Sequence, residues 1–186
     1  MIIFDEKEKI FKIDTENTSY VMGVIDEKYL VHIYYGKKLT GTHLAYLLDM
    51  DKEELSEIHI NYGEKSSFLD RLPMEYPTSG MGDFRQSCIE VAQDIGKYGV
   101  ELCYESYEII DGKSKLSGLP ATYTESEGEA QTLRIYLKDA LTGAKLALLY
   151  TIFDEYSAIA RSAYIENAGE KNLHVLNMMS LSLDLP

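Results

Sequence analysis

The chain has little cysteine and no tryptophan: its 186 residues include two Cys and four His. The histidines form no HExxH pattern and lie near no cysteine pair, so nothing supports a zinc site or any other metal centre. Cys88 and Cys103 lie among residues typical of neighbouring strands, where a disulfide is geometrically possible. Two cysteines do not define a disulfide framework, and we expect buried free thiols that do not act as nucleophiles.

Basic residues are also scarce. Lys and Arg total 18 against 31 Asp and Glu, which gives a formal net charge of -13. Such a field repels phosphate backbones, so we expect no nucleic-acid partner, whereas a neutral sugar would be unaffected. No run approaches the roughly 18 apolar residues of a membrane span, and the start lacks the features of a secretion signal. We therefore expect no membrane association and a cytoplasmic protein.

Short alternating or β-branched segments, separated by turn residues, make up most of the sequence. The predicted strands are Ser19–Ile25, Tyr29–Tyr35, Cys103–Ile110, Leu133–Leu137, Lys145–Phe153 and Ala158–Glu166. Asp111-Gly112 is the best hairpin signal among the separators. The pattern predicts an all-β fold, a large antiparallel two-sheet β-sandwich with at most one short helix, in a single domain spanning residues 1–186.

Two segments depart from the simple strand pattern, and a third returns to it at the end of the chain. Leucines recur at nearly helical spacing in Thr42–Glu57, which predicts a short helix or an ordered loop there. Asn61–Phe84 holds five Gly or Pro residues and is predicted to be the largest loop region. Leu181–Leu185 alternates like a strand.

The glycine-rich stretch Gly80–Arg85 superficially resembles a phosphate-binding loop. No lysine followed by serine or threonine comes after it, so we reject nucleotide binding and predict no cofactor. Glycines permit a tight turn that lets Asp83 and Arg85 meet, and a structural ion pair between them is favoured over a ligand contact.

Acidic residues and tyrosines are abundant without forming a recognisable catalytic motif. Asp49, Asp51 and the two glutamates that follow fit no calcium-loop register and are typical of a solvated helix face. The 15 tyrosines offer sugar platforms or interface contacts, but strand tyrosines that cover a sheet face are commoner. The tyrosines that could offer such contact area are Tyr34, Tyr35, Tyr62, Tyr76, Tyr98, Tyr104 and Tyr107.

Two stretches, Tyr76–Arg85 and Gly118–Tyr123, resemble the N-terminal domain of the glycoside hydrolase family 36 α-galactosidases, and further matching stretches extend over nearly the whole chain. The resemblance implies a sandwich that precedes a (β/α)₈ catalytic barrel. The barrel's two catalytic aspartates have no counterpart here, so we expect this chain to be a severed domain without catalytic residues. The motif residues carried by the resemblance are Tyr76, Asp83, Arg85, Pro120 and Tyr123.

The resemblance also implies partners. In tetrameric members the N-terminal domain packs on its own barrel and lends a loop to a neighbouring subunit's active site, where the substrate is an α-galactoside. The corresponding loop lies between Lys37 and Phe68, and Asp49 or Asp51 would contact sugar there. We expect a homo-oligomer whose domain supports the barrel, the assembly and the active-site entrance. The alternative is an autonomous carbohydrate-binding module.

Overall fold

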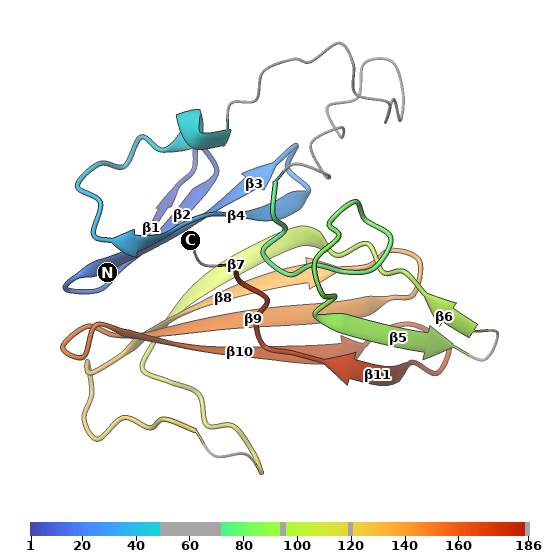
Figure 1. Ribbon diagram of the computed structural model, residues 1–186. Helices are drawn as coiled ribbons and strands as arrows, with labels where there is room; N and C mark the ends of the chain where they lie inside the picture. The colour runs from blue at the N-terminus through green and yellow to red at the C-terminus, as the bar shows by residue number, and fades with distance from the viewer. Residues whose placement is uncertain (49–71, 94–95, 119–120, 185–186) are drawn as a thin grey trace.

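The computed structural model describes residues 1–48, 72–93, 96–118 and 121–184, whose regular secondary structure is nearly all β-strand. Two four-stranded antiparallel sheets face each other, and a third sheet of three strands lies at one end of them (Figure 1). The predicted all-β antiparallel sandwich is confirmed, and the six predicted strands are all present. The small third sheet was not predicted.

The first sheet is a meander in the order β1-β2-β3-β4. Its strands are β1 (Ile2–Asp5), β2 (Ile10–Asp14), β3 (Thr18–Ile25) and β4 (Tyr29–Lys37). Asp26 and Glu27 connect β3 to β4 with φ of 50° and 57°. Two successive residues with positive φ are typical of the tight hairpin turn whose twist matches that of the strands.

The second sheet has the order β10-β9-β8-β7. Its strands are β7 (Cys103–Asp111), β8 (Gln131–Lys138), β9 (Ala144–Phe153) and β10 (Ala158–Asn167). The Asp111-Gly112 hairpin prediction is wrong in its length. Gly112 has φ of 77° and donates its N–H to Ala130 O, but the chain then leaves the sheet and returns only at β8. This connection, the 112–130 loop, hangs below the sheet in Figure 1.

The third sheet has the order β11-β5-β6 and was missed because its strands are short. They are β5 (Ile89–Gln93), β6 (Gly96–Tyr98) and β11 (His174–Met178). Cys88 immediately precedes β5 and is buried, whereas Cys103 begins β7 and is half-buried, and both are free thiols. The two cysteines therefore do not lie on neighbouring strands.

The predicted strand at Leu181–Leu185 is wrong over its described part, 181–184. Pairing along β11 ends when Met179 donates its N–H to Cys88 O. Beyond that point Ser182 O accepts a hydrogen bond from the Arg85 side chain, at 3.2 Å, and not from a neighbouring strand. A side chain thus takes the place of a backbone partner for this segment.

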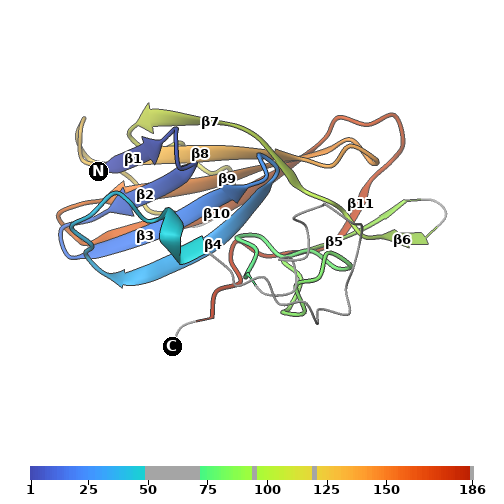
Figure 2. The same ribbon diagram turned by 90° about the horizontal axis from the view of Figure 1, so that it is seen from above.

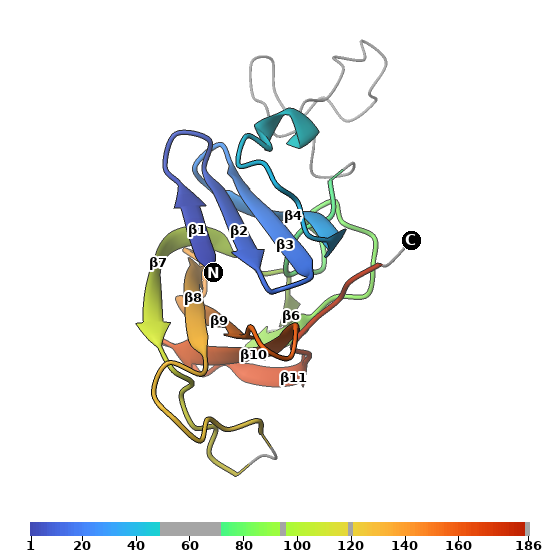
Figure 3. The ribbon, with the colours of Figure 1, turned by 90° about the vertical axis from the view of Figure 1, so that its left-hand side faces the viewer.

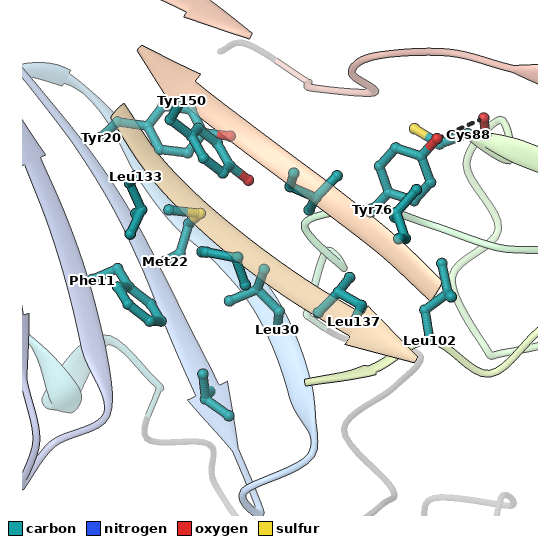
Figure 4. Close-up of a cluster of buried hydrophobic side chains, with 14 of the residues drawn as sticks. Phe11, Tyr20, Met22, Leu30, Tyr76, Cys88, Leu102, Leu133, Leu137 and Tyr150 are labelled. Carbon is teal, nitrogen blue, oxygen red and sulfur yellow. Dashed lines mark hydrogen bonds between the residues drawn. The ribbon is translucent and has the colours of Figure 1, made fainter. Parts of the chain in front are cut away.

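The main core lies between the two large sheets, where alternate residues of each strand point inward (Figures 3 and 4). Phe11, Met22 and Leu30 from the first sheet face Leu133 and Leu148 from the second, and each is no more than 1% exposed. Burial of such side chains stabilises a fold by about 1.5–3 kcal/mol each.

The first sheet is also covered on its outer face. The short 3-10 helix η1 (Ala45–Leu48) lies over β3 and β4, as Figure 2 shows. Leu44, just before η1, packs on Ile10 and Val21, while Met74 packs on Val31. The helical tendency predicted for Thr42–Glu57 is realised at η1, and residues 49–57 lie outside the described ranges. Within the described residues no helix is long and apolar enough to span a membrane.

Candidate functional site

The segment 72–88, here called the crossover segment, carries three of the predicted motif residues and a buried glutamate. It begins by pairing with β4: His32 N–H donates to Pro73 O, and Glu75 N–H donates to Leu30 O. Because side chains alternate along an extended chain, Met74 points to the outer face of the sheet and Glu75 points between the two sheets.

Glu75 is the focus of a buried ionic centre formed with Arg161, Tyr20, Tyr150 and His32. Its Oε1 accepts hydrogen bonds from the hydroxyls of Tyr20 and Tyr150, both at 2.7 Å, and from Arg161 Nη1. His32 Nδ1 lies 3.3 Å from Oε2 but is not aligned for a hydrogen bond. The Glu75 side chain is 1% exposed and that of Arg161 is 7% exposed. Strands from both large sheets and the crossover segment meet at this carboxylate.

The electrostatics keep this carboxylate charged. Burial acts to raise the pKa of Glu75, but the Arg161 guanidinium, the nearby His32 and the Tyr150 hydroxyl outweigh it and leave the pKa below its usual range. Burial next to this carboxylate also raises the pKa of both phenols, so Tyr20 and Tyr150 stay protonated as donors. A charge that is paired and hydrogen-bonded in this way is tolerated in an interior.

The buried ionic centre is suited to holding two sheets together and not to hydrolysis. A glycosidase of the usual kind places two carboxyl groups across a cleft that admits a sugar. Glu75 instead faces a cation and two phenols and is closed to solvent. Sequence reasoning missed the centre. The signal in the sequence was the alternation along β10, which places Arg161 on the same inward face as Ile159 and Ala163. A guanidinium that is buried there needs a carboxylate partner.

Asp83 and Arg85 form the predicted ion pair. Arg85 Nη2 lies 2.7 Å from Asp83 Oδ2, and Arg85 Nε lies 3.0 Å from Oδ1. Both side chains also bind the backbone of Met74: Asp83 Oδ2 accepts its N–H at 2.9 Å, and Arg85 Nη2 donates to its carbonyl at 2.6 Å. Gly82, with φ of 90°, supplies the turn that brings the pair onto Met74. Asp83 and Arg85 thus form a clamp that fixes the segment one residue before Glu75.

The clamp and Tyr76 both reach the segment 179–184. Tyr76 donates its hydroxyl hydrogen to Met179 O at 2.8 Å and lies 3.3 Å from Cys88 O (Figure 4). Arg85 Nη1 donates to Ser182 O, and its Nε lies 4.0 Å from an Asp184 oxygen. The structure therefore brings Tyr76, Asp83 and Arg85 together around one strap of chain.

The other predicted site residues do not join this group. Asp49, Asp51 and Pro120 lie outside the described residues. Tyr123 is 73% exposed on the 112–130 loop, where it lines a shallow hollow with Phe153 and Tyr156 at the β9–β10 turn. It has no structural link to the clamp among the contacts described here.

The described start of the loop that was predicted to reach a neighbouring subunit is firmly anchored. Lys12, buried on β2, donates from Nζ to Leu39 O at 2.7 Å, and Ser19 Oγ accepts the Leu39 N–H. Glu8 lies 2.9 Å from His43 Nδ1 and accepts the N–H groups of the two residues that follow. Asp5 lies close enough to complete three candidate metal donors with Glu8 and His43, but Glu8 and Asp5 already accept backbone N–H groups.

Comparison with known proteins places these features in a family context. The family model described as "Glycosyl hydrolase family 36 N-terminal domain" matches residues 28–186. Alpha-galactosidase AgaA of Geobacillus stearothermophilus is 36% identical over 185 residues, which is 100% of this chain and 25% of that protein. The bifunctional alpha-galactosidase/sucrose kinase AgaSK of Mediterraneibacter gnavus is 36% identical and is covered over 20% of its length.

Solved structures agree with the sequence matches. The galactosidase domain of AgaSK superposes with a TM-score of 0.86 at 35% identity, over 97% of this chain and 25% of that one. The family 36 α-galactosidase AgaB from Geobacillus stearothermophilus gives a TM-score of 0.82 at 36% identity, over 97% of this chain and 24% of that one. The chain thus spans about a fifth to a quarter of the length of these proteins.

Proposed function

This chain belongs to the glycosyl hydrolase family 36 N-terminal domain family, and from that premise we propose that it is the non-catalytic N-terminal domain of an α-galactosidase. In the intact enzyme it would support a (β/α)₈ catalytic barrel, contribute to oligomer assembly and shape the entrance to the active site. The enzyme's substrates would be terminal α-galactosides.

The small share of each relative that this chain covers favours a supporting role for it. Relatives that carry the name α-galactosidase align with 98–100% of the chain but with only 20–25% of their own length. Glu75, the carboxylate of the buried ionic centre, joins the two sheets of the sandwich. Both observations favour catalysis by residues outside this chain.

The observation that carries the interdomain role is the position of Phe84. Its ring is 88% exposed although both neighbours, Asp83 and Arg85, are locked against the body of the domain by the clamp. An apolar ring that stays in water does not gain the favourable free energy of burial. Such an exposed ring is therefore typical of a contact surface. We propose that Phe84 inserts between this domain and the barrel.

The region Lys37–Phe68 is the proposed contact with a neighbouring subunit. Its first part is held rigidly on the outer face of the first sheet by Lys12, Ser19 and Glu8. An anchored base is what a loop needs to present its tip to a partner, because less conformational entropy is then lost on binding. Asp49 and Asp51 follow this base in the sequence, and we propose that one of them contacts the sugar.

A chimera of Geobacillus stearothermophilus AgaA that carries this chain in place of its own matching segment tests the proposal. We expect the chimera to be soluble, oligomeric and active on melibiose, and AgaA without the segment to lose all three properties. The isolated chain should not hydrolyse nitrophenyl α-galactoside. An AgaA lacking the segment that keeps its oligomeric state and activity would contradict the supporting role.

Phe84→Ala in the same chimera separates the interdomain contact from folding. We expect a loss of thermal stability or activity in the chimera and an unchanged unfolding midpoint in the isolated chain, since the ring is already exposed there. Leu141→Ala, which truncates an apolar side chain that is 79% exposed on the β8–β9 turn, is the matched control. Equal effects of the two variants in the chimera would refute the role of Phe84.

A further inference from the structure

The outer face of the β7–β10 sheet carries a groove of about 720 Å³ that is separate from the clamp and from the buried ionic centre. Three strands, β8, β9 and β10, form its floor, and residues 114–117 of the 112–130 loop form one wall. Ala147 and Leu149 of β9 lie at the bottom, and each is 8% exposed. The groove therefore has an apolar base and an ordered rim.

Strand register places two tyrosines on either side of a small residue. Ala147 pairs with Tyr136 of β8 on one side and with Tyr164 of β10 on the other, so the three side chains form one row across the sheet. Adjacent strands are about 4.8 Å apart, which sets the two tyrosines about 9–10 Å apart at their backbones. Van der Waals contact on both sides of an inserted ring needs about 7–8 Å. The backbone spacing of this row, here called the slot, leaves room for one six-membered ring over Ala147.

Polar groups are fixed beside this slot before any ligand arrives. Tyr136 donates its hydroxyl hydrogen to Glu108 Oε1 at 2.5 Å, and Arg134 Nη1 donates to the same oxygen at 2.8 Å. Arg134 Nη2 lies 3.3 Å from Ser114 Oγ and so ties the loop wall to the sheet. Ser162, on the row next to the slot, adds a hydroxyl that both donates and accepts.

The charges of the groove select a neutral ligand. Its lining contains two acids, Glu105 and Glu166, and two bases, Arg134 and Lys145. Arg134 is already paired, and Glu166 lies opposite Lys145 in the strand register. The net charge of -13 further disfavours anions. Tyrosine faces, hydroxyl groups and balanced charge around an apolar floor suit a neutral ring that carries many hydroxyl groups.

We propose that this groove is a saccharide-binding site, with a neutral sugar ring held between Tyr136 and Tyr164 over Ala147. These tyrosines differ from those that the sequence pattern suggested for sugar contact, and the site does not depend on the proposed interdomain role. Tyr164, at 64% exposure, is the platform that faces solvent, and Tyr136 is the platform whose hydroxyl is fixed by Glu108.

The test is a titration of the ¹⁵N-labelled chain with raffinose, followed by two-dimensional NMR. We expect saturable shifts at the amides of Tyr136, Ala147, Leu149 and Tyr164 at millimolar sugar, and weaker shifts with galacturonate because it is an anion. Tyr164→Ala should weaken raffinose binding by about tenfold, as expected for an aromatic anchor. Tyr156→Ala, which truncates a ring that is 70% exposed on the β9–β10 turn and does not line the groove, should leave the binding unchanged.

A second variant fills the slot without removing a ring. Ala147→Leu places a larger side chain between the two tyrosines, and we expect the chemical-shift changes caused by raffinose to disappear. The same spectra report whether the variant is still folded. The absence of shifts with raffinose, shifts confined to another face, or unchanged binding in Tyr164→Ala would each overturn the proposal. A dimer in sedimentation that Tyr164→Ala dissociates, with no sugar effect, would assign the groove to a second copy of the chain instead.

Discussion

Replacing Glu75 by Gln should destabilise the domain far more than its size suggests. Gln retains an oxygen that accepts hydrogen bonds from Tyr20 and Tyr150, but it leaves the Arg161 guanidinium, 7% exposed, without an opposite charge. Breaking a buried ion pair from one side costs about 3–5 kcal/mol. Three interactions of Arg161 survive: its bonds to the Glu75 backbone carbonyl at 3.2 Å and to the Tyr20 hydroxyl at 3.3 Å, and its contact with the Tyr150 ring at 4.8 Å. We therefore expect the lower end, about 3 kcal/mol.

That loss is large against the roughly 5–15 kcal/mol that holds a typical domain together. It corresponds to a fall in the melting temperature of about 6–12 °C for a chain of this length. Urea unfolding followed by circular dichroism measures it directly. Glu101→Gln makes the same chemical change in the Lys28–Glu101 pair, whose side chains are 43% and 40% exposed, and should cost about 0–1 kcal/mol.

The effect should also depend on pH in a defined direction. The folded-state pKa of Glu75 is lowered, because Arg161 and its other partners outweigh burial, whereas the unfolded value is about 4.3. The stabilisation by its charge is therefore complete above that unfolded value and is lost as the pH falls through the folded one. The difference in unfolding free energy between the native chain and Glu75→Gln should therefore become smaller as the pH is lowered below about 4. Equal losses for the two glutamine variants at pH 7, or a difference that widens in acid, would refute this reasoning.

Three further perturbations test other parts of the fold. Arg85→Lys loses the forked contact with Asp83 and should lower the unfolding free energy by about 1–3 kcal/mol in urea titrations; an unchanged midpoint would show that the clamp is dispensable. Burial raises the pKa of Cys88 to about 11, so this thiol should react with Ellman's reagent only after unfolding, and rapid reaction in the native chain would contradict its burial. Gly143→Ala should destabilise more than Gly112→Ala in thermal melts: both glycines have positive φ, of 76° and 77°, but only at Gly143 would the new Cβ clash with backbone, 2.6 Å away. Equal effects of the two alanines would contradict that clash.

The strands that could be predicted are the long ones, in which alternating or β-branched residues continue for eight to ten positions. β9 and β10 are examples, and each has ten residues. The strands β1, β2, β5, β6 and β11 escaped prediction because three to five residues give too few alternations to separate a strand from a loop. The turn at Asp111-Gly112 was correctly found as a turn, yet the length of the connection after it depends on packing against the outer face of a sheet.

The candidate site divides in the same way. The pairing of Asp83 with Arg85 was predictable because the two residues are neighbours in a glycine-rich turn, where local geometry decides their contact. The partnership of Glu75 with Arg161 was not, since these residues are 86 positions apart and meet only when the sheets pack. The slot at Ala147 likewise depends on the register of three strands.

By itself, the sequence determined the all-β class, most of the long strands, the Asp83–Arg85 pair and, through its motifs, the family. These properties follow from local backbone preference and from short-range spacing, which every unfolded chain already contains. Only the tertiary structure decided which charge would be buried, which phenylalanine would stay in water and which tyrosines would flank one alanine on the sheet. The physical reason is that burial, desolvation and cross-strand proximity arise between residues far apart in the chain, after the sheets have closed over their core.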